Sequence, residues 1–245
     1  MLPGRLSRQR YETVDALMAR ELRPIYLLAD SQLLFWKHGE SRFIDPLRNA
    51  AQARSPRAAY IGASNADAPE YYGIFQAAME GIGIHDCTMI HSSFSSREQA
   101  FLEDADIILL SGGDVAAGWK VISETGMKDV IVKRYHAGAT LIGVSAGAVQ
   151  LGLYGLTEGH NASGELFDTF KLCAFVVSAH DENREWSALA KTITLLQGTA
   201  RGIGIPAGAG LVYHRDDSIE AVRHPSFHFS FTQGVVRCDV LRPKA

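Results

Sequence analysis

Five short segments of the chain are apolar at nearly every position, instead of alternating between apolar and polar residues. They cover residues 25–29, 58–63, 106–112, 140–145 and 172–178. Strands buried on both faces have this continuous pattern, whereas strands with one face in water alternate. The five segments therefore predict strands of a buried, mostly parallel sheet.

Between these runs, apolar residues recur with the period of a helix. The segments are 68–83, 96–105 and 118–138. In the first, Tyr72, Phe75 and Met79 fall on one face, and Gly81 marks a helix end. Helices that alternate with parallel strands cover both faces of the sheet. We therefore predict an α/β fold, built as a three-layer sandwich around a mostly parallel sheet.

The two ends of the chain depart from this pattern. Beyond Gly198, short β-like runs are separated by Gly, Pro and Asp pairs, which predicts a β-rich C-terminal end. Residues 1–22 have an amphipathic pattern that predicts a helix outside the sheet. No linker, low-complexity tract or internal repeat interrupts residues 1–245, so we expect a single domain.

Composition and charge narrow the function classes. The chain has 245 residues, of which 47% are hydrophobic and 21% charged, and its net charge is -3. No block of like charge supplies the electrostatic footprint of a nucleic-acid partner. No apolar run reaches the ~18 residues of a membrane span, and the N-terminus lacks the apolar core of a signal peptide. We expect a cytoplasmic protein without a nucleic-acid or membrane partner, and leave a homo-oligomer open.

Metal-binding motifs are missing from the sequence. Cys87, Cys173 and Cys238 are widely spaced and form no CxxC pair, so neither a zinc site nor a disulfide framework is indicated. His224 and His228 have the i, i+4 spacing of a metal pair, but an intervening proline argues against the helix that such a pair needs. We expect neither a metal nor a cofactor.

The strongest chemical signal is G-x-S-x-G, in residues 143–147, between a predicted strand and a predicted helix. In this context the pattern is typical of a nucleophile elbow, a strained turn that presents a serine hydroxyl to a substrate. The N–H of Ala146, at the start of the helix, can bond the oxyanion that develops during attack. A tight turn that tolerates only small side chains is the alternative reading of Ser145.

A serine hydroxyl needs a base, since it is a weak nucleophile at neutral pH. His180 lies just past the next predicted strand, which would bring it to the same edge of the sheet as Ser145. His160, in a Gly/Asn-rich loop, is the poorer candidate. A Gly-Gly turn after the run 106–112 can also face an anion with its N–H groups, although a plain turn explains it equally well.

Four motifs in this order resemble the serine peptidase family of dipeptidase E and cyanophycinase. They are "ILLSGGDVAAGW", "LIGVSAGAVQLG", "AFVVSAHDENREW" and "GIGIPAGAGLVY", and the resemblance runs from about residue 58 to about residue 213. It implies a class I glutamine amidotransferase-like fold, with Ser145 as nucleophile and His180 as general base. It also implies an oxyanion hole formed by the N–H groups of Gly113 and Ala146, and a small aspartyl or β-aspartyl peptide as substrate.

One position departs from the family pattern. Cyanophycinase-like members have acidic residues after "GIGI", one of which orients the histidine, but this chain has Pro206 and Ala207 there. Dipeptidase E takes its acid from the loop after the nucleophile, where this chain offers Glu158, Glu165 and Asp168. Glu158 is nearest in spacing and is our candidate, with an inert loop carboxylate as the alternative. Loss of the orienting acid lowers the rate and leaves the type of reaction unchanged.

Two further residues are candidates for substrate binding. Arg184 could hold a carboxylate with its two parallel donors, and a surface arginine is the alternative. Asp114 could face the substrate or cap the following helix, and capping is the simpler explanation.

The sequence thus predicts a serine-type hydrolase of small peptides or amides. A catalytically weakened relative that binds a small ligand is the first alternative. A serine-containing, amidotransferase-like acyl transferase is the second, and the lack of a synthetase partner domain in this chain speaks against it.

Overall fold

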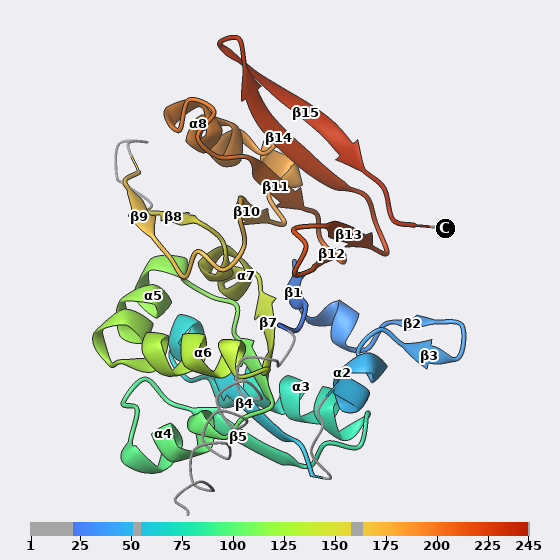
Figure 1. The fold of residues 1–245 in the computed structure, drawn as a ribbon, viewed down its shortest axis with the longest axis vertical. Helices are drawn as coiled ribbons and strands as arrows, with labels where there is room; N and C mark the ends of the chain where they lie inside the picture. Colours follow the sequence, from blue (N-terminus) through green and yellow to red (C-terminus); the bar gives the residue numbers. More distant parts are fainter. Residues whose placement is uncertain (1–21, 51–54, 158–163, 245) are drawn as a thin grey trace, which may run out of the picture.

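The computed structural model describes residues 22–50, 55–157 and 164–244. Its centre is a seven-stranded sheet in the order β13-β12-β1-β7-β6-β4-β5. Five neighbouring strands are parallel, and two antiparallel strands extend one side (Figure 1). The parallel strands are β1 (Ile25–Leu28), β4 (Arg57–Ile61), β5 (Asp86–Ile90), β6 (Ile107–Leu110) and β7 (Thr140–Val144), and the antiparallel ones are β12 (Gly210–Tyr213) and β13 (Ile219–Val222). The mostly parallel sheet predicted from the apolar runs is confirmed.

Helices cover both faces of this sheet. One core cluster joins it to α2 (Asp45–Ala50) and α3 (Pro69–Glu80), and the other joins it to α4 (Ser96–Glu103), α5 (Val115–Glu124), α6 (Met127–His136) and α7 (Ala146–Leu151). Phe75 and Met79 of α3 are buried as the helical period predicts, and Gly81 ends the helix. The predicted three-layer sandwich is confirmed.

The helical pattern of residues 118–138 contains two helices rather than one. They separate at Gly126, which has a φ of 84°. This left-handed conformation is open to glycine and costly for most other residues, so the chain can turn there. The apolar period continues across the break, because α5 and α6 bury their apolar faces against the same core cluster.

A second sheet of four strands, in the order β10-β11-β14-β15, adjoins the first. Its strands are β10 (Val176–Ala179), β11 (Gly202–Ile205), β14 (Ser226–Thr232) and β15 (Val235–Leu241), and α8 (Ser187–Leu195) packs on it through Leu189 and Ile193. The expected β-rich C-terminal end is confirmed. The expectation that residues 172–178 form a strand of the central sheet is wrong: β10 starts at Val176 and pairs with β11. An apolar run shows that a strand is buried, but not which strand it pairs with.

Short elements connect these layers. They are η1 (Ser31–Leu34), β2 (Lys37–His38), β3 (Ser41–Arg42), η2 (Ala63–Asn65), β8 (Tyr154–Leu156), β9 (Leu166–Asp168) and η3 (Glu182–Arg184). No helix in the described ranges has the length and apolar character to cross a membrane. The helix predicted for residues 1–22 lies outside the described residues, except for the last of them.

Candidate active site

Ser145 occupies the sharp turn between β7 and α7. Its backbone has φ 50° and ψ -109°, a conformation that side-chain-bearing residues rarely adopt. Two backbone hydrogen bonds hold the turn. The N–H of Ser145 donates to the carbonyl oxygen of Leu28 at 2.8 Å, and the N–H of Gly147 donates to the carbonyl oxygen of Ser111 at 3.1 Å. A Cβ on Gly147 would lie 2.2 Å from the carbonyl oxygen of Leu110. The small residues around Ser145 are therefore required by close backbone packing.

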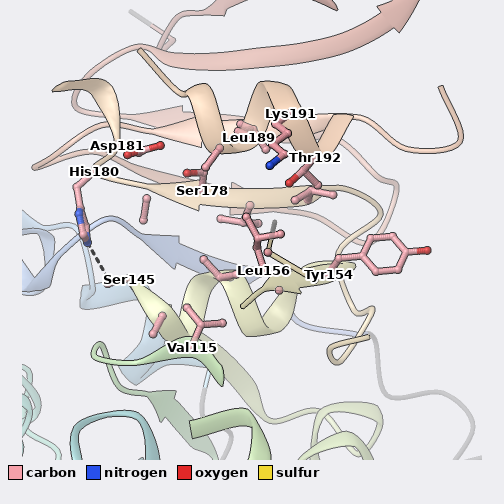
Figure 2. A pocket seen from close by; sticks show the side chains of 18 of the residues that line it. Val115, Ser145, Tyr154, Leu156, Ser178, His180, Asp181, Leu189, Lys191 and Thr192 are labelled. Carbon is pink, nitrogen blue, oxygen red and sulfur yellow. Dashed lines mark hydrogen bonds between the residues drawn. The ribbon is translucent and has the colours of Figure 1, made fainter. Parts of the chain in front are cut away.

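His180 reaches the serine from the second sheet. It follows β10 directly, and its N–H donates to the carbonyl of Ile205 at 2.8 Å. Its Nε2 lies 2.7 Å from the Oγ of Ser145, which is hydrogen-bonding distance (Figure 2). The sequence predicted that a strand of the central sheet would bring His180 to Ser145. His180 does reach Ser145, but it follows β10, a strand of the second sheet.

Two backbone amides next to the serine are available to an anion. The N–H groups of Gly113 and Ala146 donate no hydrogen bond among the described residues. Gly113 has a φ of 132°, and a Cβ there would lie 1.9 Å from the carbonyl oxygen of Ser64. This position therefore requires glycine, and the turn brings its amide to the cavity that Ser145 lines.

A buried glutamine supports both turns, and the sequence analysis did not single it out. Gln150 of α7 is fully buried, and its Nε2 donates to the Oγ of Ser64 and to the carbonyl of Val115, each at 3.0 Å. The Gln150 side chain thus links α7, which follows Ser145, to η2 and to the start of α5. Because Gly113 lies between those two elements, we infer that these hydrogen bonds hold the Gly113 turn in place relative to Ser145. A glutamine inside an otherwise apolar helical run was the available signal.

No carboxylate hydrogen-bonds to His180 among the described residues. Glu158 lies outside the described residues. Asp168 forms an ion pair with Lys171 at 2.8 Å, and Glu165 lines neither cavity next to the serine. The side chains of Ser145 and His180 thus meet as a pair in the part of the chain that the structure describes.

The turn after "GIGI" receives two carboxylates from elsewhere in the chain. The N–H of Ala207 donates to Oε1 of Glu182 at 3.1 Å, and that of Gly208 donates to Oδ2 of Asp30 at 2.6 Å. Glu182 therefore connects the segment that follows His180 to the turn at Pro206 and Ala207. Neither carboxylate was singled out by the sequence analysis.

Two cavities open next to Ser145 and His180. The larger, of about 930 Å³, lies between α7, the β8–β9 hairpin, β10 and α8 (Figure 2). The smaller, of about 250 Å³, lies on the side of η1 and α3. Arg184 lines the larger cavity. Asp114 lines neither: its Oδ1 accepts the N–H of Ala117 at 2.9 Å and caps α5, as the simpler reading of the sequence had it.

Within the described ranges, no group of three or more His, Cys, Asp or Glu side chains could hold a metal ion. His224 and His228 do not form a helical pair, because His228 lies within β14.

Comparisons with known proteins place this geometry in a family. The model of peptidase family S51 matches residues 27–221. Among solved structures, that of a peptidase from an acI-B1 Actinobacterium superposes with a TM-score of 0.70 at 15% identity, covering 94% of this chain and 98% of that one. A putative peptidase E protein from Listeria monocytogenes EGD-e gives a TM-score of 0.58 at 16% identity, covering 82% of this chain and 98% of that one. A search of curated proteins found no match.

Proposed function

Since this chain belongs to peptidase family S51 and is a serine-type peptidase, we propose that Ser145 is its nucleophile, His180 its general base, and a small peptide its substrate. The observation that carries this proposal is the 2.7 Å separation of Ser145 Oγ and His180 Nε2 at the end of a strained turn. General base catalysis requires the two atoms to be within this reach.

The proposed reaction has two halves. In the first, Ser145 Oγ attacks the scissile carbonyl carbon while His180 Nε2 takes the hydroxyl proton. The N–H groups of Gly113 and Ala146 stabilise the oxyanion, and His180 then donates its proton to the leaving amine as the acyl-enzyme forms. In the second half, water attacks the acyl-enzyme with His180 again as base, and Ser145 is released.

The hydrogen-bond partners of His180 affect the expected turnover rate. In a serine triad the acid holds the imidazole in the correct tautomer and stabilises the imidazolium, and its loss costs about 10⁴-fold in turnover. Here the hydrogen bond between the His180 N–H and Ile205 fixes the backbone, while Nδ1 has no partner among the described residues. We therefore expect slow turnover, unless Glu158 supplies the acid.

The substrate class we propose is a small aspartyl or β-aspartyl peptide. Arg184 supports it, because this residue lines the larger cavity together with Ser145, and a guanidinium can hold a carboxylate in a bidentate pair. A weakened relative that only binds such a peptide is the second candidate, and it is favoured by the lack of a carboxylate hydrogen-bonded to His180 among the described residues.

Labelling with a fluorophosphonate probe separates these two candidates. We expect the native protein to be labelled near neutral pH, and the label to be lost in Ser145→Ala and strongly reduced in His180→Ala. Ser178→Ala is the matched control, because Ser178 lines the same cavity on β10 but does not bond to His180. An unlabelled native protein whose fold is intact would support the ligand-binding candidate.

A further inference from the structure

The smaller cavity beside Ser145 has apolar walls. Its lining includes Leu34 of η1, Tyr60 of β4, Leu109 of β6, and Tyr71, Ile74 and Phe75 of α3. Ser145 and His180 line this cavity as well as the larger one. A substrate attacked by Ser145 therefore has space on two sides of its scissile bond, and the two sides differ in chemistry.

Two of the apolar side chains that line this cavity are exposed to solvent. Tyr71 is 53% exposed and Ile74 is 37% exposed, and both belong to the helix that forms one wall. Exposed apolar side chains that gather at a concave surface are typical of a binding site rather than of ordinary surface. Because both line the cavity that Ser145 also lines, an apolar group bound in that cavity would contact them.

The wall behind them is an aromatic cluster. The ring of Tyr60 lies 5.5 Å from that of Phe75 and 5.8 Å from that of Tyr72, and the last two rings are 6.2 Å apart. Phe75 is buried, and burial raises the pKa of the Tyr60 hydroxyl, so this wall carries no charge near neutral pH. Packed rings of this kind form a rigid, preorganised surface for a flat apolar group.

The polar groups of the smaller cavity also suit a neutral guest. Asn65 donates through Nδ2 to the Tyr60 hydroxyl at 2.7 Å, while its Oδ1 is buried without a partner among the described residues. Asp30 carries the cavity's carboxylate, and both of its oxygens already accept N–H groups, from Gln32 at 2.9 Å and from Gly208 at 2.6 Å. Neither Lys nor Arg is among the described residues that line this cavity.

The larger cavity differs from the smaller one in its cations: Arg184 and Lys191 line it together with Asp181, among mostly apolar residues. Resting on the proposed function, we propose that the smaller cavity is a subsite for a neutral apolar or aromatic side chain, while the larger cavity takes the carboxylate. The peptide that this site cleaves then joins an acidic residue to an apolar one. A second acidic residue would meet Asp30 and the aromatic wall without a cationic partner. A basic residue would lose its hydration against that wall, and the carboxylate there, Asp30, already accepts three N–H groups, from Gln32 and Gly208.

Matched dipeptides test this proposal. Asp-Phe, Asp-Glu and Asp-Arg, with their β-aspartyl and reversed forms, are compared by kcat/KM. We expect the apolar partner to be favoured by about tenfold or more. Ile74→Arg, at an exposed position on the cavity wall, should weaken that preference and improve the glutamate-containing peptide. Val235→Arg is the control, because Val235 is 60% exposed and lines neither cavity.

Two outcomes would overturn the proposal. In the first, Asp-Glu or Asp-Arg is cleaved as well as Asp-Phe. In the second, Ile74→Arg leaves the ranking unchanged. Fluorophosphonate labelling of the same samples reports the Ser145–His180 pair separately. If no dipeptide is cleaved, the binding of the same dipeptides to Ser145→Ala is measured by thermal shift instead. We then expect Asp-Phe to bind most tightly, and equal binding of all three would contradict the proposal.

Discussion

The two sheets of this molecule contribute to the site in different ways. The central sheet supplies Ser145 from β7, which is buried along its whole length between β1 and β6. The second sheet supplies His180 at the end of β10, and its outer strand β15 is largely exposed. The nucleophile is therefore fixed by close backbone packing, whereas the base is fixed by a backbone hydrogen bond to the end of β11 and by the hydrogen bonds of the turn that follows β11. Local substitutions should act differently in the two regions.

The largest expected effect concerns the pair that joins the sheets. Ser145→Ala and His180→Ala should each lower kcat/KM by on the order of 10²-fold or more, because the two groups act as a unit and the native turnover is already expected to be slow. The double variant should be no worse than the single ones, and the melting temperature should change little in all three. Steady-state kinetics with circular dichroism checks this. Additive losses would mean that the two sheets contribute independently, contrary to the pairing.

A matched pair of glycines compares the packing of the two sheets. Gly147→Ala should lower the free energy of unfolding by about 3 kcal/mol, because the new Cβ would meet the backbone of β6 at 2.2 Å. Gly202→Ala, in β11, should cost about 1 kcal/mol, because its Cβ would meet the ends of the Leu189 and Ile193 side chains, which can move. Urea unfolding measures both values. Equal losses of unfolding free energy in the two variants would contradict the difference in packing between the two regions.

The loop that holds the histidine offers a milder test. Glu182→Ala removes the carboxylate that accepts the Ala207 N–H. A hydrogen bond to a charged group contributes roughly 1.5–3 kcal/mol, and partial exposure reduces that value, so we expect kcat to fall about tenfold. KM should stay constant if Glu182 positions His180 only. Glu182→Gln keeps an acceptor and should restore most of the rate; a variant as slow as alanine would show that charge, not geometry, matters.

The last test concerns how stability depends on pH, and it involves Glu98 of α4, a helix that packs against the central sheet. Burial of Glu98 at the start of α4 raises the pKa of its carboxyl, but hydrogen bonds from Ser95 and His91 outweigh it and lower the pKa to about 2, from 4.5. Because the folded pKa is the lower one, the ionised group stabilises the protein above pH 4.5, and this contribution is lost as the pH falls toward 2. Glu98→Gln should therefore be less stable than the native protein at pH 7.

The stability difference between the native protein and Glu98→Gln should narrow steadily between pH 4.5 and pH 2. Unfolding in urea at several pH values measures it. A difference that is the same at pH 7 and pH 2.5 would contradict the role of the ionised carboxyl.

The sequence predicted the central sheet well because burial on both faces leaves a direct mark on it. Residues 141–144, for example, include no polar side chain, and the small residues around Ser145 reflect the close backbone packing at the elbow. The partner of a strand leaves no such mark: residues 172–178 are as apolar as the others, yet β10 pairs with β11. The break at Gly126 was missed because α5 and α6 share one apolar period.

The rest of the site depends on residues that are distant in the chain. Asn65 and Ile74 line the smaller cavity together with Ser145 only because three separate elements meet there. Glu182 and Asp30 reach one turn from opposite parts of the sequence. Neither hydrophobic period nor motif spacing encodes such meetings, which depend on how the layers pack. Short motifs therefore located the reacting pair, and only the structure located the walls around it.

The arrival of His180 from its own sheet has a consequence for how this enzyme can change over evolutionary time. A substitution in β10, β11 or the turn at Ala207 alters the base without disturbing the packing that forms the elbow. Substitutions around His180 can thus lower or restore activity while the turn that holds Ser145 remains intact. Pro206 and Ala207 stand where the resemblance to cyanophycinase-like members predicts acidic residues, while the nucleophile turn around Ser145 is intact, and a difference confined to one half is what this separation allows.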